Sequence, residues 1–329
     1  MKTNICKSAA LVTFITAGAI GTLSLPVQAV ESVTLQLATI ASPGNVWLEA
    51  AQKFSDGVAE RTDGKVSIQI SHSGTTGSVR ESVEALQIGT NDIVQTVIAS
   101  LEPYDDLAAI ESYPYLIRDE AHFDKVFNGP VGEELYDAIG QATGFKLIGA
   151  GFRGAREMAS KKAVNTLSDL HGIKMRVPEI PVFRRTWESL GASPIPMSSK
   201  EVYTALNEGI IDAVENPLEA HIRSRYYEAA DYVIMTNHVY GAYTFLFSDG
   251  RFASFSPELR AILEEEGRKA MQWGGEQTKK EIEGYKTQLQ AHGVTILSPE
   301  LSAFREELKP LAGEFPKLKP WIEKIAAVE

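Results

Sequence analysis

The stretch DLHGIKMRVPEIPVFRRTWESLGASPIPMSSKEVYTALNEGIIDAVENPL, residues 169–218, decides the fold class of this chain. It opens with a strand-like segment, HGIKMRV (171–177), and closes with a second, IIDAVE (210–215). Two segments with helical periodicity, 181–190 and 200–208, lie between them. Strands separated by helices of this length are typical of α/β units, whose strands pair mainly in parallel.

The same alternation continues on both sides of this stretch. Apolar runs predict strands at 33–40, 66–70, 92–99 and 146–150, and periodic segments predict helices at 45–62, 79–89 and 120–142. A long helix begins after Ser256, a good N-cap before Pro257, and continues to about Ala291. A kink is expected at Gly274 and Gly275, because each glycine costs about 1 kcal/mol relative to alanine in a helix. The sequence therefore predicts an α/β protein without an evident linker.

Charge balance and the absence of catalytic motifs exclude several classes of function. The 329 residues include 32 lysines and arginines against 43 aspartates and glutamates, a net charge of −11, which disfavours binding to nucleic acid or to an anionic membrane. The sequence contains one cysteine and no HExxH, GxSxG, GxGxxG or Walker A pattern. We therefore expect no enzymatic activity, no catalytic residue, no metal site and no cofactor. A secreted hydrolase is the alternative, and it would need a nucleophile–base pair that the sequence does not display.

The first 29 residues have the pattern of a secretory signal peptide. Lys2 and Lys7 flank the start of an apolar run from about Ala9 to Leu25, and Val27-Gln28-Ala29 fits a signal peptidase site. The run is short for a membrane span and is interrupted by glycine and proline, which makes a membrane anchor the weaker interpretation. We expect cleavage near Ala29 and a mature protein exported to the periplasm.

Arg176 is the strongest candidate for binding chemistry. It lies between the apolar Met175 and Val177, and a charged side chain there must face a polar cleft or have a partner, because burying it alone is costly. A guanidinium offers paired N–H donors that match the two oxygens of a carboxylate, a geometry that lysine cannot reproduce. The residues alone leave two interpretations open, an arginine in a structural or surface ion pair and an arginine that clamps a ligand carboxylate.

The 169–218 stretch resembles the signature region of the solute-binding proteins of TRAP transporters. The phrases IKMRVP (173–178) and ENP (215–217) are the most specific, and GSVRE (77–81) and PYLIRD (114–119) support them. The resemblance implies a small organic-acid ligand, delivery of that ligand to the membrane subunits of a TRAP permease, and a monomeric receptor.

The fold that the resemblance implies is α/β, a two-lobed periplasmic-binding-protein clamshell (type II-like) with a long helix spanning both lobes. Lobe I would contain 30–153 and 242–281, and lobe II would contain 154–241 and 282–329. The ligand would be buried between the lobes, which would close around it.

The resemblance also implies three ligand-binding residues. Arg176 matches the carboxylate clamp of the family. Arg156, in REMASKKAV, best fits a second family arginine, with Arg153 as a near rival. Asn216, in the ENP turn, matches an asparagine that hydrogen-bonds the same region of the ligand, and its amide offers both a donor and an acceptor.

Glu179, three residues after the expected clamp, bears on which acid is bound. If it faces the cleft, it repels a second ligand carboxylate and accepts hydrogen bonds from ligand hydroxyls. If it faces solvent, it gives no information about the ligand. We therefore expect a sugar acid, a uronate or aldonate, with a C4-dicarboxylate as the runner-up. Further ligand contacts are expected at Arg80, Gln95, Ser100 and Trp47. A periplasmic ligand-sensing subunit of a signalling system is an alternative from another class.

Overall fold

The computed structural model describes Met1 and residues 32–329. The predicted signal peptide, apart from Met1, and its cleavage site near Ala29 lie outside this part of the chain. None of the helices in the described part is both long and apolar enough to cross a membrane.

A ten-stranded sheet forms the body of the protein, and one long strand joins its two halves. Its main path runs through β2 (Val66–Ser71), β1 (Val33–Thr39), β3 (Ile93–Val97), β9 (Tyr240–Ser248), β4 (Phe145–Ser160), β7 (Ala213–Pro217), β5 (Lys174–Val177) and β6 (Ser193–Pro196). Off this path, β8 (Tyr232–Ile234) pairs with β4, and β10 (Thr295–Leu297) pairs with β8.

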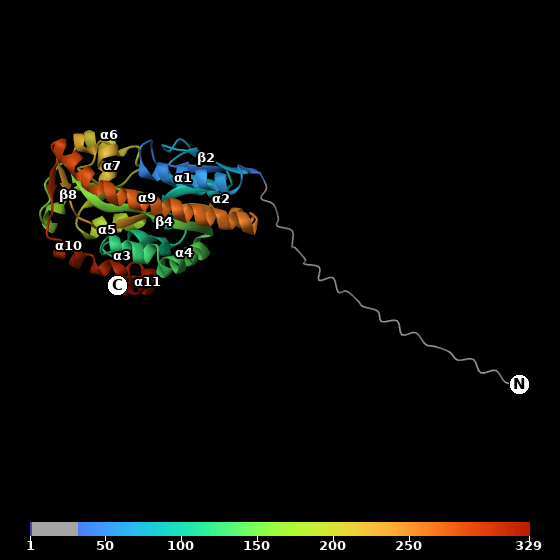
Figure 1. Ribbon diagram of the computed structural model, residues 1–329. Coiled ribbons are helices and arrows are strands. Elements are labelled where there is room, and N and C mark those ends of the chain that lie inside the picture. Colours follow the sequence, from blue (N-terminus) through green and yellow to red (C-terminus); the bar gives the residue numbers. More distant parts are fainter. Residues whose placement is uncertain (2–31) are drawn as a thin grey trace.

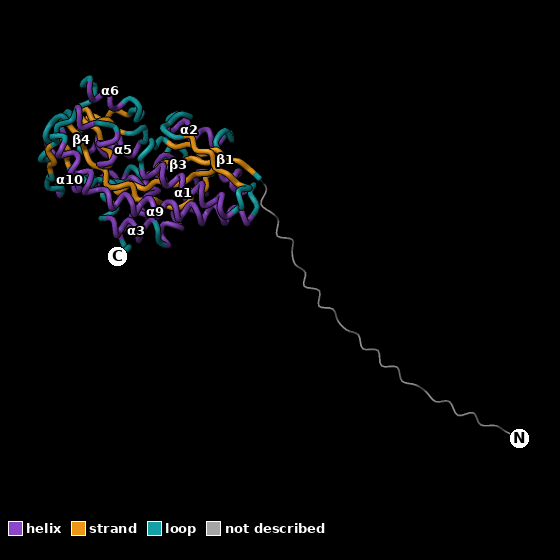
Figure 2. The backbone as a smooth tube through the Cα atoms, turned by 45° about the horizontal axis from the view of Figure 1, so that its top comes forward, coloured by secondary structure: helices purple, strands orange, loops and turns teal. Residues whose placement is uncertain are grey.

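The strand β4 belongs to both halves. Its residues from Phe145 to Ala155 pair with β9, and those from Arg156 to Ser160 pair with β7. The first half therefore contains β2, β1, β3, β9 and the start of β4, and the second half contains the end of β4 with β7, β5, β6, β8 and β10. Figure 2 shows β1 and β3 toward one end of the molecule and β4 reaching into the other.

The expectation of mainly parallel strands is confirmed within the outer parts of each half only. β1 is parallel to β2 and β3, and β5 is parallel to β6 and β7. β4 and β9 are antiparallel to each other, and they also oppose β7 and β3, respectively. The reason is connectivity, because β4 carries the chain from the first half into the second and β9 carries it back.

Eleven α-helices in the described residues cover the sheet: α1 (Val46–Arg61), α2 (Val79–Gln87), α3 (Glu120–Phe127), α4 (Pro130–Thr143), α5 (Pro181–Ser189), α6 (Val202–Asn207), α7 (Leu218–Arg223), α8 (Asp249–Ala253), α9 (Pro257–Ala291), α10 (Ser302–Glu307) and α11 (Lys319–Ala326). Short 3₁₀ helices lie at Ile98–Leu101, Asp106–Ser112, Leu167–Leu170, Tyr226–Glu228, Lys309–Gly313 and Pro316–Leu318. The helical stretch expected over 120–142 is two helices, because Pro130 has no N–H for a helix interior and begins α4.

The long helix α9 crosses both halves of the molecule. Figure 1 shows it running the length of the protein, and it packs against α1 at one end and against α7 and β10 toward the other. The helix is continuous through Gly274 and Gly275, where a kink was expected, and both glycines lie close against the sheet. A Cβ on Gly274 would lie 1.9 Å from the hydroxyl oxygen of Tyr243, and one on Gly275 would lie 2.9 Å from the backbone nitrogen of Phe152. The glycines let helix and sheet touch without interrupting the helix.

Aromatic side chains fill the cores on either side of β4. In the first half Phe54 stacks on Phe245 with ring centroids 4.4 Å apart. In the second half Trp187 and Tyr226 are fully buried. The C-terminal end packs beside α3, where the guanidinium of Arg118 donates hydrogen bonds to two carbonyls of the last residues.

Candidate ligand-binding site

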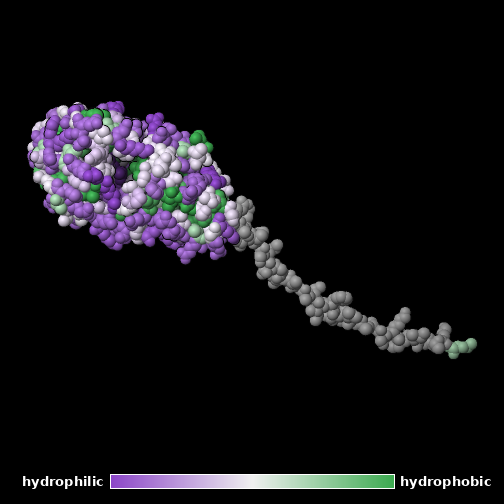
Figure 3. All heavy atoms as spheres, turned by 90° about the horizontal axis from the view of Figure 1, so that it is seen from above, coloured by the Kyte–Doolittle hydropathy of each residue, from purple (hydrophilic) through white to green (hydrophobic). Residues whose placement is uncertain are grey.

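A cavity of about 530 Å³ lies between the two halves, a size within the usual range of roughly 300–1,000 Å³ for small-molecule sites. Figure 3 shows the molecule hollowed between two bodies on this face. The first half contributes α1, α2 and the segment after β3 to the lining. The second half contributes the ends of β5 and β7 and the start of α5. A ligand in this cavity would contact both halves.

The strand β5 presents Arg176 to this cavity. Met175 and Val177 are fully buried, so the alternation of a strand turns Arg176 to the opposite face. Its Nε and Nη2 both donate to the carbonyl oxygen of Met197, at 2.9 and 2.6 Å. The residue is 4% exposed and forms no ion pair within residues 32–329, and this burial lowers the pKa of its guanidinium. Arg176 is therefore a buried cation with a carbonyl as its partner.

Arg156 also lines the cavity, but its charge is already matched. Its Nε and Nη2 reach the two carboxylate oxygens of Glu215, the second at 2.7 Å, and Nη2 donates to the Glu215 carbonyl as well. The pair is almost fully buried, and His238 lies 3.1 Å from the same carboxylate. Burial alone would raise the pKa of the Glu215 carboxyl, yet Arg156 and His238 lower it to about 2. Glu215 is thus the counter-ion of Arg156.

A bulge in β4 lets Arg153 reach the same cavity. Residues three apart in a regular strand point to opposite faces, yet both Arg153 and Arg156 line the cavity. The register of β4 against β9 shifts between Phe152 and Ala155, and Gly154 at that point has a φ of +95°. The positive φ favours glycine, and the extra residue of the bulge re-aims the side chain before it.

Arg153 has polar and aromatic partners but no carboxylate at ion-pair distance in the described residues. Its Nη2 donates to the Oδ1 of Asn216 at 3.1 Å, and its Cζ lies 4.7 Å from the ring centroid of Trp47. Burial and the nearby Arg156 lower the pKa of Arg153 to about 9, which still leaves it a cation at neutral pH. Together with Arg176 it gives the cavity two cations that form no ion pair within residues 32–329.

The remaining predicted residues divide into two groups. Ser100, Arg80 and Glu179 line the cavity. The Ser100 hydroxyl donates to Val97, exposed Arg80 pairs with Glu84 at 3.0 Å, and exposed Glu179 forms no ion pair within the described chain.

Gln95, by contrast, is buried outside the cavity lining. Its Nε2 donates to the Trp47 carbonyl at 2.7 Å and its Oε1 accepts from the Thr39 hydroxyl, so its amide supports the backbone next to the site. The structure thus brings together every predicted site residue except Gln95.

The comparison with known protein families agrees with this geometry. The family described as "Bacterial extracellular solute-binding protein, family 7" matches residues 37–318, which is most of the chain. The chain belongs to this family, the solute receptors of TRAP transporters. The expected two-lobed α/β clamshell with a long helix spanning both lobes is confirmed.

Three relatives illustrate the range of this receptor family. A solute-binding protein of Roseobacter denitrificans is 29% identical over 90% of this chain and 91% of its own, and its crystal structure with bound L-galactonate has a TM-score of 0.84 to this chain. The sialic acid-binding periplasmic protein SiaP of Vibrio cholerae is 27% identical over 94% of this chain and 97% of its own. A TRAP solute-binding protein of Xanthobacter autotrophicus with bound β-D-galacturonate is 26% identical, covers 90% of this chain and 100% of its own, and has a TM-score of 0.86.

Sequence reasoning missed the roles of three residues in or behind the lining of this receptor's cavity. Glu215 stands directly before Asn216 in the ENP phrase, so its position was visible but its role as counter-ion was not. The ring of Phe183 lies 4.6 Å from the Cζ of Arg156. Met197 contributes its backbone carbonyl, for which a sequence carries no signal. Within residues 32–329, no three histidine, cysteine, aspartate or glutamate residues are grouped so that they could hold a metal ion.

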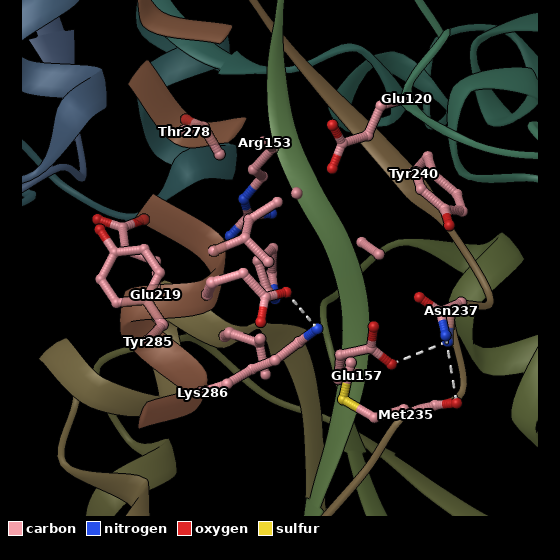
Figure 4. Close-up of a pocket in the computed structure, with 16 residues that line it drawn as sticks. Glu120, Arg153, Glu157, Glu219, Met235, Asn237, Tyr240, Thr278, Tyr285 and Lys286 are labelled. Atoms are coloured by element: carbon pink, nitrogen blue, oxygen red, sulfur yellow. Dashed lines mark hydrogen bonds and ion pairs between the residues drawn. The ribbon is translucent and has the colours of Figure 1, made fainter. Parts of the chain in front are cut away.

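A second cavity of about 230 Å³ lies along β4, and Arg153 borders it as well. Figure 4 shows its polar lining, with Glu219 and Tyr285 on one side of β4 and Asn237 and Tyr240 on the other. The carboxylate of Glu157 accepts a hydrogen bond from the backbone N–H of Asn237 at 2.8 Å. Burial raises the pKa of Glu157 to about 8 despite this bond, so the group is mostly protonated at neutral pH.

Proposed function

We propose that this protein is the extracytoplasmic receptor of a TRAP transporter, that it binds a sugar acid between its halves, and that it delivers the acid to a membrane permease. The observation that supports this most directly is the pair of arginines, Arg153 and Arg176, facing one cavity without a carboxylate partner. Uncompensated buried cations are costly, so the site is complementary to an anion that enters with its own charge. A carboxylate can accept from two arginines at once.

Arg156 takes a different role in this proposal from the clamp expected for it. Its bidentate bond to Glu215 uses its Nε and Nη2 donors and balances its charge, so Arg153, its near rival in the sequence, is the second clamp beside Arg176. Asn216 orients Arg153 through its Oδ1, which leaves the amide NH₂ group available for the ligand. The ion pair of Arg156 holds the β7 end that carries Asn216.

Polar side chains around the rest of the cavity support a hydroxyl-rich acid, a uronate or aldonate. The hydroxyl-bearing residues Ser78, Ser198, Ser199 and Tyr104 line it, and Glu179, which also lines it, adds an acceptor. Relatives with this fold and more than a quarter identity were crystallised with L-galactonate and β-D-galacturonate. A C4-dicarboxylate is the second candidate, because two unpaired arginines can also take two carboxylates.

Two contacts between the halves support a closed, loaded state as the form that a permease recognises. Lys200 Nζ, before α6, donates to the Gly74 carbonyl at 2.9 Å, and the Glu102 carboxylate accepts from the Val182 N–H in the first turn of α5 at 3.0 Å. A ligand that bridges the halves favours this state through its extra contacts there. The division into 30–153 with 242–281 and 154–241 with 282–329, and the periplasmic location, are parts of the same proposal.

A thermal-shift and calorimetric screen of the mature protein tests the function. The panel contains D-galacturonate, D-glucuronate, L-galactonate, C4-dicarboxylates and the neutral sugars galactose and glucose. A ligand at a thousand times its Kd adds about 4 kcal/mol of stability, so binding is readily seen. Stabilisation by sugar acids and not by neutral sugars is the expected result. If only dicarboxylates stabilise the protein, its ligand is a dicarboxylate and not a sugar acid. If no acid raises the Tm, the receptor function is contradicted.

A further inference from the structure

The guanidinium of Arg153 is held between the two halves of the protein. On one side its Cζ lies 4.7 Å from the Trp47 ring, which is the range of a cation–π contact. On the other side its Nη2 bonds the amide oxygen of Asn216 in β7. A flexible side chain of this length would otherwise sample many rotamers, so each contact reduces the entropy lost when a ligand binds.

Trp47 is itself fixed on several sides. It stands at the start of α1, where the Asn45 side chain caps its N–H at 2.7 Å. Gln95 binds its carbonyl, as described above. Its ring stacks on Tyr243 with centroids 4.6 Å apart and an interplanar angle of 21°. Trp47 is 5% exposed, which is typical of a residue that is part of the scaffold.

The support continues beneath Trp47 to the crossing of β4, β9 and α9. Tyr243 lies where a Cβ on Gly151 or Gly274 would approach it to 2.5 and 1.9 Å, so both glycines leave the room that its ring occupies. The Tyr243 hydroxyl is buried without a hydrogen-bond partner in the described chain.

Two protein groups lie against the Trp47 indole. The Tyr243 ring is stacked on it with centroids 4.6 Å apart, and the Cζ of Arg153 lies 4.7 Å from its centroid. These contacts and its 5% exposure leave little of the indole for a ligand, although Trp47 belongs to the lining of the cavity. This differs from the direct ligand contact expected for Trp47 from the sequence.

We propose that Trp47 is a positioning residue for the ligand carboxylate, acting through Arg153: the Tyr243–Trp47 stack presents a rigid π face that pre-orients the Arg153 guanidinium in the empty protein. The inference rests on the proposed function, because it assumes that Arg153 binds the carboxylate. It assigns to the first half an arginine already aimed at the cavity, so that closure has only to bring Asn216 and Arg176 to the ligand.

A double-mutant cycle with D-galacturonate and L-galactonate as probes tests the affinity part. Trp47→Leu removes the π face and is expected to weaken binding about three- to thirty-fold. In an Arg153→Met background the same substitution is expected to change affinity less than about twofold, because nothing remains to be oriented. Trp47→Phe, which keeps an aromatic face, is expected to retain most of the affinity. An equal loss from Trp47→Leu with and without Arg153 would overturn the proposal.

Trp273→Leu is the matched control. Lys53 Nζ lies 4.6 Å from the Trp273 ring, a contact of similar geometry elsewhere on the protein, and Trp273 does not line the cavity. Its removal is expected to leave the affinity for both probes unchanged.

A ligand-free measurement separates this inference from the proposed function. The Nε–Hε resonance of Arg153, observed by NMR in the empty protein, is expected to carry an upfield ring-current shift that Trp47→Phe reduces and Trp47→Leu removes. If neither acid binds the wild type, the receptor function fails but this shift still decides whether Trp47 orients Arg153. If the Nε–Hε chemical shift of Arg153 is the same in the wild type and in both Trp47 variants, the inference is overturned, whichever ligand the protein binds.

Discussion

Replacing Arg176 with lysine keeps the positive charge and removes the fork that is proposed to clamp the ligand. Two N–H groups of Arg176 donate to the Met197 carbonyl, and its other N–H groups are available to a carboxylate. Lysine can satisfy one oxygen at a time, so one charge-assisted hydrogen bond of about 1.5–3 kcal/mol is lost. Affinity is expected to fall roughly 10- to 100-fold.

The thermal shift gives the same prediction in a second assay. At a thousand times Kd the ligand adds about 4 kcal/mol to the wild type, whereas a 100-fold weaker variant at the same concentration gains about 1.4 kcal/mol. For a protein of this size the rise in Tm would fall from roughly 7 °C to roughly 2 °C. Calorimetry with D-galacturonate measures the affinity directly.

An exposed arginine supplies the control for this substitution. Arg61 pairs with Glu265 and Glu266 on the surface, at 2.9 and 3.1 Å, so Arg61→Lys is expected to change neither affinity nor the ligand-induced shift. Unchanged affinity in Arg176→Lys would refute the clamp. A loss of ligand binding accompanied by partial unfolding of the empty protein would show that Arg176 supports the fold instead.

Three further predictions concern the surroundings of the site. Glu215→Gln leaves the buried Arg156 without its counter-ion and is expected to cost about 3–5 kcal/mol in urea unfolding, and a change below about 1 kcal/mol would contradict a structural pair. The raised pKa of Glu157, about 8, means that its contribution to stability is fully present below the unfolded-state pKa and is lost as pH rises through 8. Glu157→Gln is therefore expected to match the wild-type Tm near pH 4 and to exceed it at pH 9, and parallel Tm curves would disprove this. Gly274→Ala is expected to destabilise the protein by about 1–3 kcal/mol through overpacking, whereas Gly284→Ala in the same helix, with open space around it, is expected to stabilise it by up to about 1 kcal/mol. Equal effects at the two glycines would show that the close approach is not what constrains α9.

The order of helices and strands was largely predictable from local pattern. The strand and helix of the Arg176 segment lie within a few residues of their predicted limits, because apolar alternation and the proline at the start of α5 act over short distances. The strand expected at 146–150 extends to Ser160, and β9 was not predicted at all. Both strands lie in the middle of the sheet, where burial on two faces hides the period-two signal.

Local sequence predicts the orientation of some of these side chains and not of others. Alternation in β5 is enough to turn Arg176 away from the core. The orientation of Arg153 depends on a bulge set by pairing with β9, a strand that follows it by more than 80 residues in the chain. Gln95 was predicted as a ligand contact because its amide can donate and accept hydrogen bonds. In the structure this amide donates to the Trp47 carbonyl instead of facing the cavity.

The sequence by itself determined the family, the α/β class, the long helix and the arginine of the IKMRVP phrase, since these depend on periodicity, capping residues and a contiguous motif. Tertiary structure alone decided which of two neighbouring arginines is held in an ion pair. Arg153 and Arg156 have the same chemistry and stand three residues apart, and only the fold brings Glu215 to one and Trp47 to the other. The physical reason is that an arginine can bind a ligand only if its charge is not already balanced by a carboxylate of the protein. That carboxylate comes from a residue distant in the chain, so the local sequence does not show whether it is present.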